Sequence, residues 1–467
     1  MKSHKKLIFA LILALLFALT VFSSCNPKAE ENAEYELKIV SGMLIDINVI
    51  GQGKVDVTVP DEVINIGGSV FKNNKQIRSV TFPNGFRELS AECFSGCVSL
   101  ERVVIPEGVT SIPVKAFYGC ISLEEVNIPD SVTSVDRTSF AGCEKALKVE
   151  DGVYYIGNWA VDCRKDVFGI TLREGTVGIA DQAFMDRSEL YYAVLPEGLL
   201  HLGDEAFKKS GILEILLPDS LITLGEGAFE YSELKKCQLP EGITRIPERC
   251  FYHSRISEMD IPDSVVSIGA NAFFHEDYYS ITGEPYLYID NWLVGRRYII
   301  GIREHEEQVT VRKGTVGIAE GVFHYDETEL VSVHLNLPRG LKYICDPCSN
   351  RFVLSVNVPE TVEDFSTISC KEISFESGRD ELDLSALIGK RLSVYLPSDT
   401  KILPYDGRSI YRDAKLMIKR GQMHYEWVAC INGEERVLTD GEKNDPEFIR
   451  ALICDTEGFE WLYGSVS

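Results

Sequence analysis

The chain has 467 residues, of which 45% are hydrophobic and 25% are charged, so its composition is that of a folded protein and not a disordered one. Its length is too great for one compact core and predicts either several domains or one elongated array. The formal net charge of −24 disfavours contact with phosphate backbones, and nucleic acid is therefore excluded as an expected partner.

Residues 1–24 have the pattern of an export signal. Three lysines within the first six residues precede an uncharged apolar run at 7–22, which is slightly short for a membrane-spanning helix. The sequence Phe22-Ser23-Ser24-Cys25 that closes the run resembles the cleavage box of bacterial lipoproteins, in which the cysteine becomes the lipid-bearing first residue. This resemblance predicts a lipid on Cys25, and an ordinary signal peptide with an incidental cysteine is the alternative.

Residues 25–35 are mostly polar and predict a flexible tether. Asn26 follows the cysteine, as it does in lipoproteins that are passed on to the outer membrane. We therefore expect an exported outer-membrane lipoprotein that contacts the membrane through its N-terminal lipid. The rest of the chain then faces the cell surface or, alternatively, the periplasm.

A repeat of 21–23 residues fills the region 36–369. Its units read approximately Leu-x-x-Val-x-Ile-Pro, then Asp/Glu-Gly/Ser-Val-Thr-x-Ile, then Ala-Phe-x-x-Cys. The alternating first segment predicts a short half-buried strand, the proline ends it, and Ala-Phe is expected on a short helical turn. One such unit cannot bury its apolar face, but stacked units cover one another. The repeated phenylalanines are therefore expected to form a core spine and not a cofactor site. They are Phe71, Phe94, Phe117, Phe140, Phe184, Phe207, Phe229, Phe251, Phe273 and Phe323.

The segment "AFYGCISLEEVNIPDSVTSV" at 116–135 and its copies resemble the BspA-like class of leucine-rich repeats found in bacterial surface proteins. The resemblance covers about residues 36–365. It implies a β-rich solenoid, a curved right-handed coil with short parallel strands and short helical turns. It also implies a role in surface binding or attachment and not a chemical reaction.

Two inserts interrupt the repeat, near 150–172 and 284–312. They share the sequences "YIGNWAV" and "YIDNWLV", and each predicts a β-hairpin that heads a block of repeats. The segment "LKIVSGMLIDI" at 37–47 looks like a third, diverged copy. Trp159 and Trp292 at the hairpin tips suggest a platform for stacking glycans. The alternative is that these rings pad the solenoid where a repeat is missing.

The region 370–467 is expected to contain a degenerate last repeat at 387–397 and a hairpin around Asn432-Gly433. A short helix is expected at 446–454. Together these elements predict either a small α+β cap over the last repeat or a small separate module.

Three of the 13 cysteines, Cys97, Cys120 and Cys143, recur 23 residues apart at one position of the repeat. This spacing predicts a stacked column of reduced, buried thiols and not disulfides. The pair Cys345 and Cys348 supplies too few ligands for a closed structural zinc site.

The sequence has no HExxH, GxSxG or phosphate-binding glycine motif, so we expect no enzyme, no cofactor and no metal ion. The predicted function is that of a lipid-anchored cell-envelope binding protein that attaches a host or neighbouring-cell macromolecule, protein or glycan. The alternatives are a glycan-binding accessory protein of a nutrient-uptake system and a structural envelope protein. Alternation along the strands places the candidate binding residues outward: Arg102, Val104, Tyr192, Val194 and Leu216.

Overall fold

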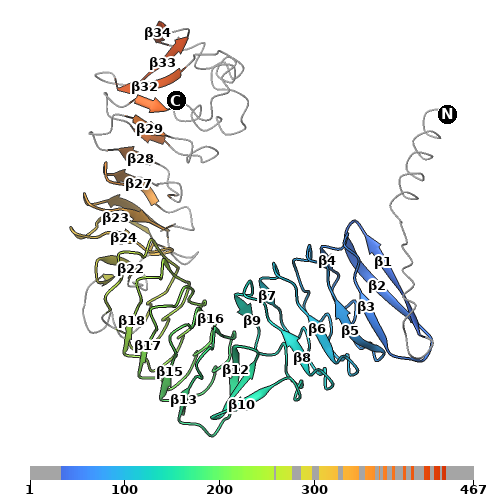
Figure 1. Cartoon of the computed structure of the whole chain (residues 1–467). Helices are drawn as coiled ribbons and strands as arrows, with labels where there is room; N and C mark the ends of the chain where they lie inside the picture. The colour runs from blue at the N-terminus through green and yellow to red at the C-terminus, as the bar shows by residue number, and fades with distance from the viewer. Residues whose placement is uncertain are drawn as a thin grey trace, which may run out of the picture. The chain divides into compact units, whose positions relative to one another are not determined.

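The computed structural model describes residues 33–256, 259–275, 285–296, 304–323, 330–345 and 353–362, with shorter segments between 368 and 437. They fall into two compact units. The first comprises residues up to 243 together with 250–256, and the second comprises 244–249 together with 257–467. The regular elements of the described residues are β-strands (Figure 1). No apolar helix long enough to cross a bilayer occurs in this part of the chain.

In the first unit, short strands of successive repeats pair in parallel, so each repeat forms one rung of a ladder. Asp56, Ser79, Arg102 and Glu125 stand side by side across four rungs, and every rung therefore presents its side chains in the same register. The four strands are β3 (Val55–Thr58), β5 (Ile77–Thr81), β6 (Arg102–Val104) and β8 (Glu125–Asn127). Two-residue strands form a second column, namely β4 (Asn65–Ile66), β7 (Ser111–Ile112) and β9 (Ser134–Val135).

The later part of the first unit repeats this arrangement. Its rungs are β13 (Gly169–Thr171) with β15 (Tyr192–Val194), β17 (Glu214–Leu216) with β18 (Lys236–Gln238), and β14 (Gly178–Ile179) with β16 (His201–Leu202). All three pairs are parallel. The predicted solenoid of short parallel strands is confirmed.

Three antiparallel hairpins stand where the sequence predicts them. They are β1 (Glu34–Val40) with β2 (Met43–Ile50), β11 (Val153–Ile156) with β12 (Trp159–Cys163), and β21 (Tyr286–Ile289) with β22 (Trp292–Arg296). Strand β10 (Lys148–Glu150) extends the second hairpin. The second strand of each hairpin then pairs in parallel with the next rung: β2 with β4, β12 with β14, and β22 with β24 (Gly317–Ile318). Each hairpin therefore heads a block of repeats.

The second unit also contains a ladder of parallel strands, and its last strands lie in the region 370–467, where a degenerate last repeat is expected. Its long parallel sheet contains β23 (Glu304–Thr310), β25 (Leu330–Asn336), β27 (Val353–Val358), β28 (Glu372–Phe375) and β30 (Ser393–Tyr395). The shorter pairs are β19 (Arg245–Ile246) with β20 (Ser267–Ile268), β24 with β26 (Tyr343–Ile344), and β29 (Glu381–Asp383) with β31 (Lys401–Leu403). The strands β32 (Lys415–Arg420), β33 (Tyr425–Ile431) and β34 (Glu434–Val437) pair antiparallel, which confirms the hairpin around residues 432–433. The helix expected at 446–454 lies outside the described residues.

The predicted helical turns are wrong for the described repeats. Around Phe117, Lys115 and Gly119 both have positive φ, at 53° and 71°, and most of the other repeats have the same pattern two residues before and after the phenylalanine. A left-handed residue on each side ends any right-handed helix. What remains is a turn, in which the Cys120 amide donates to the carbonyl of Phe117 at 3.1 Å.

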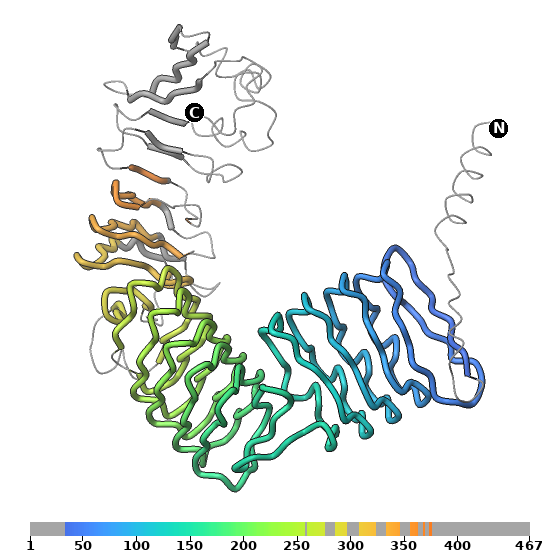
Figure 2. The backbone as a smooth tube through the Cα atoms, viewed as in Figure 1, coloured from blue at the N-terminus to red at the C-terminus, as the bar shows by residue number. Residues whose placement is uncertain are grey.

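The backbone of the first unit runs in successive turns (Figure 2). The phenylalanines of these turns form the predicted core spine. From Phe71 to Phe140 the rings of successive rungs stack nearly parallel, with centroids 4.7–5.2 Å apart. The stack from Phe184 to Phe251 has spacings of 5.2–5.6 Å. These rings are buried, and the hairpin β11–β12 lies in the sequence between the two stacks.

The cysteine column is confirmed as well. Cys97, Cys120 and Cys143 are free and buried. Each thiol lies 2.8–3.1 Å from the carbonyl oxygen of the phenylalanine one rung earlier. Burial raises the pKa of the Cys97 thiol to about 12, so the side chain stays a neutral donor.

Candidate interaction surface

The strand ladder of the first unit has one face directed inward and one directed outward. Along β6, Val103 is buried while Arg102 and Val104 are exposed, and the same alternation recurs along β15 and β17. All five residues predicted to point outward are exposed: Arg102, Val104, Tyr192, Val194 and Leu216.

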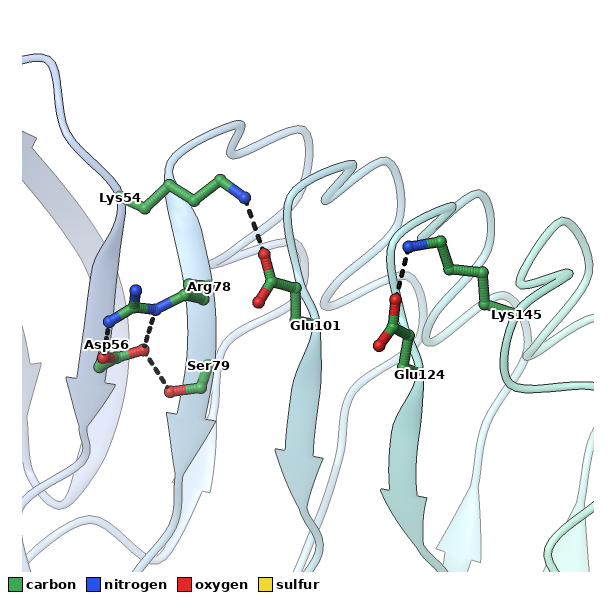
Figure 3. A network of polar contacts seen from close by, with 7 residues as sticks. All are labelled: Lys54, Asp56, Arg78, Ser79, Glu101, Glu124 and Lys145. Carbon is green, nitrogen blue, oxygen red and sulfur yellow. Dashed lines mark hydrogen bonds and ion pairs between the residues drawn. The ribbon is translucent and has the colours of Figure 1, made fainter.

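We call the strands β3, β5, β6 and β8 with their turns the first block. The outward face of the first block is polar, and charged side chains on it pair with one another (Figure 3). Arg78 donates to both carboxylate oxygens of Asp56, and Ser79 donates to the same carboxylate at 2.6 Å. The hydrogen bond from Arg78 lowers the pKa of Asp56 below its ordinary value. Lys54 reaches Glu101 two rungs away at 2.8 Å.

Arg102 belongs to this compensated group. Its Nε lies 2.6 Å from a carboxylate oxygen of Glu125 on the next rung, so a partner would have to compete for the guanidinium. Both side chains are well exposed, and an ion pair of this kind is weak. The other predicted residue of the first block is Val104. Its apolar side chain is exposed, and its strand β6 exposes no large apolar side chain beside it.

The second block, whose strands are β13, β15, β17 and β18, is different, because large apolar side chains are exposed on its strands and directly before them. Leu216 is 71% exposed, Phe168 is 62% exposed and Tyr192 is 57% exposed. The sequence argument missed the members that stand just before the strands instead of on them. We call the following set the strand-face patch: Phe168, Tyr191, Tyr192, Val194, Leu213 and Leu216.

The backbone register holds the strand-face patch together. The amide of Tyr191 donates to the carbonyl of Phe168 at 2.9 Å, and their rings are parallel within 1° with centroids 6.4 Å apart. The ring of Tyr192 lies over Gly169 on the neighbouring rung, where a Cβ would come within 2.0 Å of the ring. Gly169 therefore provides the space that lets the tyrosine lie down along the face.

The hypothesis of a glycan platform at the hairpin tips is wrong, because both indole rings are buried. Trp159 is 1% exposed and Trp292 is 2% exposed. Each lies over the glycine opposite it in the parallel pair, Gly178 or Gly317, and so fills the space next to the following rung. Their positions agree with the alternative, in which the rings pad the solenoid.

The same polar arrangement secures the two hairpins that contain tryptophan. In the first, the hydroxyl of Tyr155 accepts the amide of Arg173 at 3.1 Å, and the guanidinium of Arg173 lies 4.3 Å from the tyrosine ring centroid. In the second, Tyr288 and Arg312 have the same two distances. In the N-terminal hairpin, Tyr35 accepts the amide of Thr58 at 3.0 Å. The sequence signal was the shared spacing of tyrosine and tryptophan, Tyr155 with Trp159 and Tyr288 with Trp292.

Cys25 lies outside the described residues. Within them, no group of three or more His, Cys, Asp or Glu side chains is arranged to hold a metal ion.

Residues 54–164 and 156–282 match the model of the BspA type leucine rich repeat region, in six copies. The chain belongs to the BspA-type leucine-rich repeat family. The resemblance predicted from the repeat is therefore confirmed. Leucine-rich repeats of this family are typical of non-catalytic binding proteins.

Solved structures similar to this BspA-type chain include a leucine-rich repeat protein from Bacteroides ovatus, a leucine rich cell surface protein from Faecalibacterium prausnitzii and the pneumococcal vaccine antigen PcpA. The Bacteroides protein is 20% identical with a TM-score of 0.22, over 75% of this chain and 100% of the other. The Faecalibacterium protein is 18% identical with a TM-score of 0.24, over 83% and 97%. PcpA is 15% identical with a TM-score of 0.21, over 83% and 89%. A search of the curated proteins gave no match.

Proposed function

We propose that this protein is exported, anchored through a lipid on Cys25, and binds a protein of a host or neighbouring cell through the strand-face patch. The proposal rests on the difference between the exposed side chains of the first block and those of the second. The outward face of the first block pairs its own charges, whereas that of the second exposes Phe168, Tyr192 and Leu216. Contiguous exposed apolar groups in a polar surround are typical of interaction sites.

The composition of the patch favours a protein partner. Tyrosine and phenylalanine are enriched at the centres of protein interfaces, where charged residues are depleted. Glu214 and Lys236 pair with each other at 3.4 Å beside the patch and supply part of a polar rim. The parallel rungs fix the spacing of these side chains before binding, which limits the entropy lost on association.

A cell-binding assay tests the patch. The labelled chain is added to host epithelial cells and to neighbouring bacteria, and the Leu216→Asp variant is compared with Thr81→Asp, which places the same charge on an outward position of the first block. The proposal predicts that Leu216→Asp lowers binding by roughly tenfold or more, as expected for a charge in an apolar interface centre. Equal binding by both variants and the parent chain would refute the site.

Protease treatment of intact producing cells tests the location. Cleavage of the repeats supports outward display. Survival of the chain until the outer membrane is opened contradicts attachment to other cells and favours the structural envelope role. The Cys25→Ser variant is expected to move from the membrane fraction to the soluble fraction, and retention in the membrane would argue against the lipid anchor.

A further inference from the structure

The first strand of the N-terminal hairpin lies at the edge of its sheet. The strands of this sheet follow the order β1, β2, β4, so β1 is outermost at the N-terminal end of the first unit (Figure 1). No strand of the described residues pairs with its outer edge. A seven-residue edge of this kind presents unpaired amides and carbonyls, and it is able to bind a further strand.

The hairpin β11–β12 shows how such an edge accepts a strand. Its first strand is covered by β10, which runs antiparallel with Glu150 opposite Val153. Both hairpins have a β-bulge, directly after Tyr154 in one and directly after Lys38 in the other, so these two residues occupy equivalent positions. The edge of β1 around Lys38 is therefore equivalent to an edge that binds an antiparallel strand elsewhere in the same unit.

The chain does not fold back on β1 as it folds back on β11. Before β11 it reverses at Asp151 and Gly152, which both have positive φ, and so supplies β10 itself. At the equivalent positions, Tyr35 and Glu36, the chain continues as an extended strand that stays paired with β2. β1 is therefore longer than β11, and the described residues leave its outer edge open.

The charges of β1 indicate which strand fits this edge. Glu36 and Lys38 are exposed, and neither has an ion-pair partner among the described residues, in contrast to the paired charges of the first block. Asp46 stands opposite Lys38 on β2, but its carboxylate accepts the amide of Ile47 at 2.9 Å. A partner strand that offers one cation and one anion at matching positions would pair both charges.

β1 itself meets this requirement. If two copies of β1 pair antiparallel about Leu37, Glu36 of each copy stands opposite Lys38 of the other, and all seven residues overlap. On the buried side, Tyr35 then stands opposite Ile39, so the apolar face of one copy continues into the other. Registers centred on Glu36 or on Lys38 instead place like charges directly opposite each other, which is destabilising.

We propose that β1 pairs with β1 of a second copy of this chain and forms a symmetric dimer through one continuous antiparallel sheet. The contact is the same on both copies, so it closes at two. It adds mainly backbone hydrogen bonds and two exposed ion pairs, and the expected Kd is therefore weak, about 1–100 μM. The proposal goes beyond binding by the strand-face patch and does not depend on it.

Analytical ultracentrifugation of the purified chain from about 1 to 200 μM tests the dimer in the expected range of Kd. Every sample contains Cys25→Ser, so that a lipid cannot associate the copies. A reversible monomer–dimer equilibrium is expected, and amide hydrogen exchange of residues 34–40 should slow at the higher concentrations. A chain that stays monomeric throughout, or one that forms larger open-ended assemblies, would overturn the proposal.

Two charge reversals test the register. Glu36→Lys and Lys38→Glu each place like charges opposite each other in their own dimer, and each should weaken association by about tenfold or more. An equimolar mixture of the two variants again sets lysine opposite glutamate, and it should form a heterodimer about as tight as the parent dimer. A mixture that associates no better than either variant alone would overturn the pairing about Leu37.

Two further variants show whether the effect belongs to β1. Lys235→Glu is the matched charge reversal at an exposed position of the second block, and it should change the Kd by less than about twofold. Equal dissociation constants of Lys38→Glu and Lys235→Glu would place the contact elsewhere and overturn the proposal. Leu216→Asp should dimerise as the parent chain does, which separates this result from a failure of the strand-face patch.

Discussion

The indole ring of Trp159 covers Gly178, its partner across the parallel pair β12–β14, so closely that a Cβ on the glycine would lie 2.4 Å from the ring. Trp292 and Gly317 repeat this relationship at the same distance in the second unit. The hairpin heads therefore depend on a glycine that lies 19 or 25 residues further along the chain.

Replacing Gly178 by alanine is expected to force the indole out of its position. The free energy of unfolding should fall by about 1–3 kcal/mol, which is the usual cost of overpacking a filled core. Gly85→Ala is the matched control, since a Cβ there meets no atom within 4 Å and the backbone is not left-handed. Chemical denaturation monitored by tryptophan fluorescence measures both, and equal stability of the two variants would contradict the packing argument.

Asp181 gives the first unit a pH-dependent stability. Its carboxylate accepts from Ser134 and from the Asp204 amide, but burial raises the pKa of Asp181 from 3.8 to about 6. Between these values the folded chain holds a proton that the unfolded chain has released. The stability contributed by this group is therefore present below about pH 4 and lost as the pH rises through about 6, by about 1–3 kcal/mol.

The Asp181→Asn variant has a side chain that is neutral at every pH tested. Denaturation at several pH values should show that its stability relative to the parent chain increases from pH 4 to pH 7, while the exposed-turn variant Asp219→Asn follows the parent. A constant difference between the Asp181→Asn variant and the parent across this range would show that Asp181 does not titrate as its burial predicts.

The thiol column is expected to resist alkylation. Cys97 and Cys120 are buried. Burial raises the pKa of the Cys97 thiol, and contact with the Cys143 thiol together with burial raises that of Cys120, so the reactive thiolate is scarce at neutral pH. Mass spectrometry should find these residues unmodified by iodoacetamide in the folded protein and fully modified after unfolding without reductant. Failure to modify them after unfolding would mean that they are bridged.

Truncation of the spine should cost far more than loss of a surface ion pair. Phe117→Ala removes a buried ring that stacks on Phe94 and Phe140, at an expected cost of about 3–5 kcal/mol. Lys54→Ala breaks the exposed pair with Glu101 at an expected cost below about 1 kcal/mol. Urea denaturation compares the two, and similar costs would mean that the surface pairs contribute more than their exposure allows.

The repeat, the hairpins and the outward strand positions were predictable because each depends on side-chain order alone. Periodicity places Phe94 under Phe117, and strand alternation places Tyr192 and Leu216 outside. The turns were mispredicted because left-handed residues such as Lys115 carry no special side chain. The glycine two residues after the phenylalanine in several repeats, such as Gly119, was the one local signal against a helix.

The burial of Trp159 was not predictable from its hairpin, because the atoms that cover it belong to a rung formed later in the chain. Phe168 and Leu213 were missed for a related reason. They precede their strands, and they join Tyr191 only through the parallel register of three rungs.

The two hairpins that contain tryptophan pair with the next repeat in the same way. Their second strands, β12 and β22, each pair in parallel with a two-residue strand, and a tryptophan lies opposite a glycine in each pair. A chain in which one of these hairpins is joined to the repeats that follow the other is therefore expected to keep its register. Blocks of repeats can be added or removed at these hairpins while each junction keeps its packing. Length polymorphism in whole blocks, and not point substitution alone, is the form of variation that this architecture tolerates.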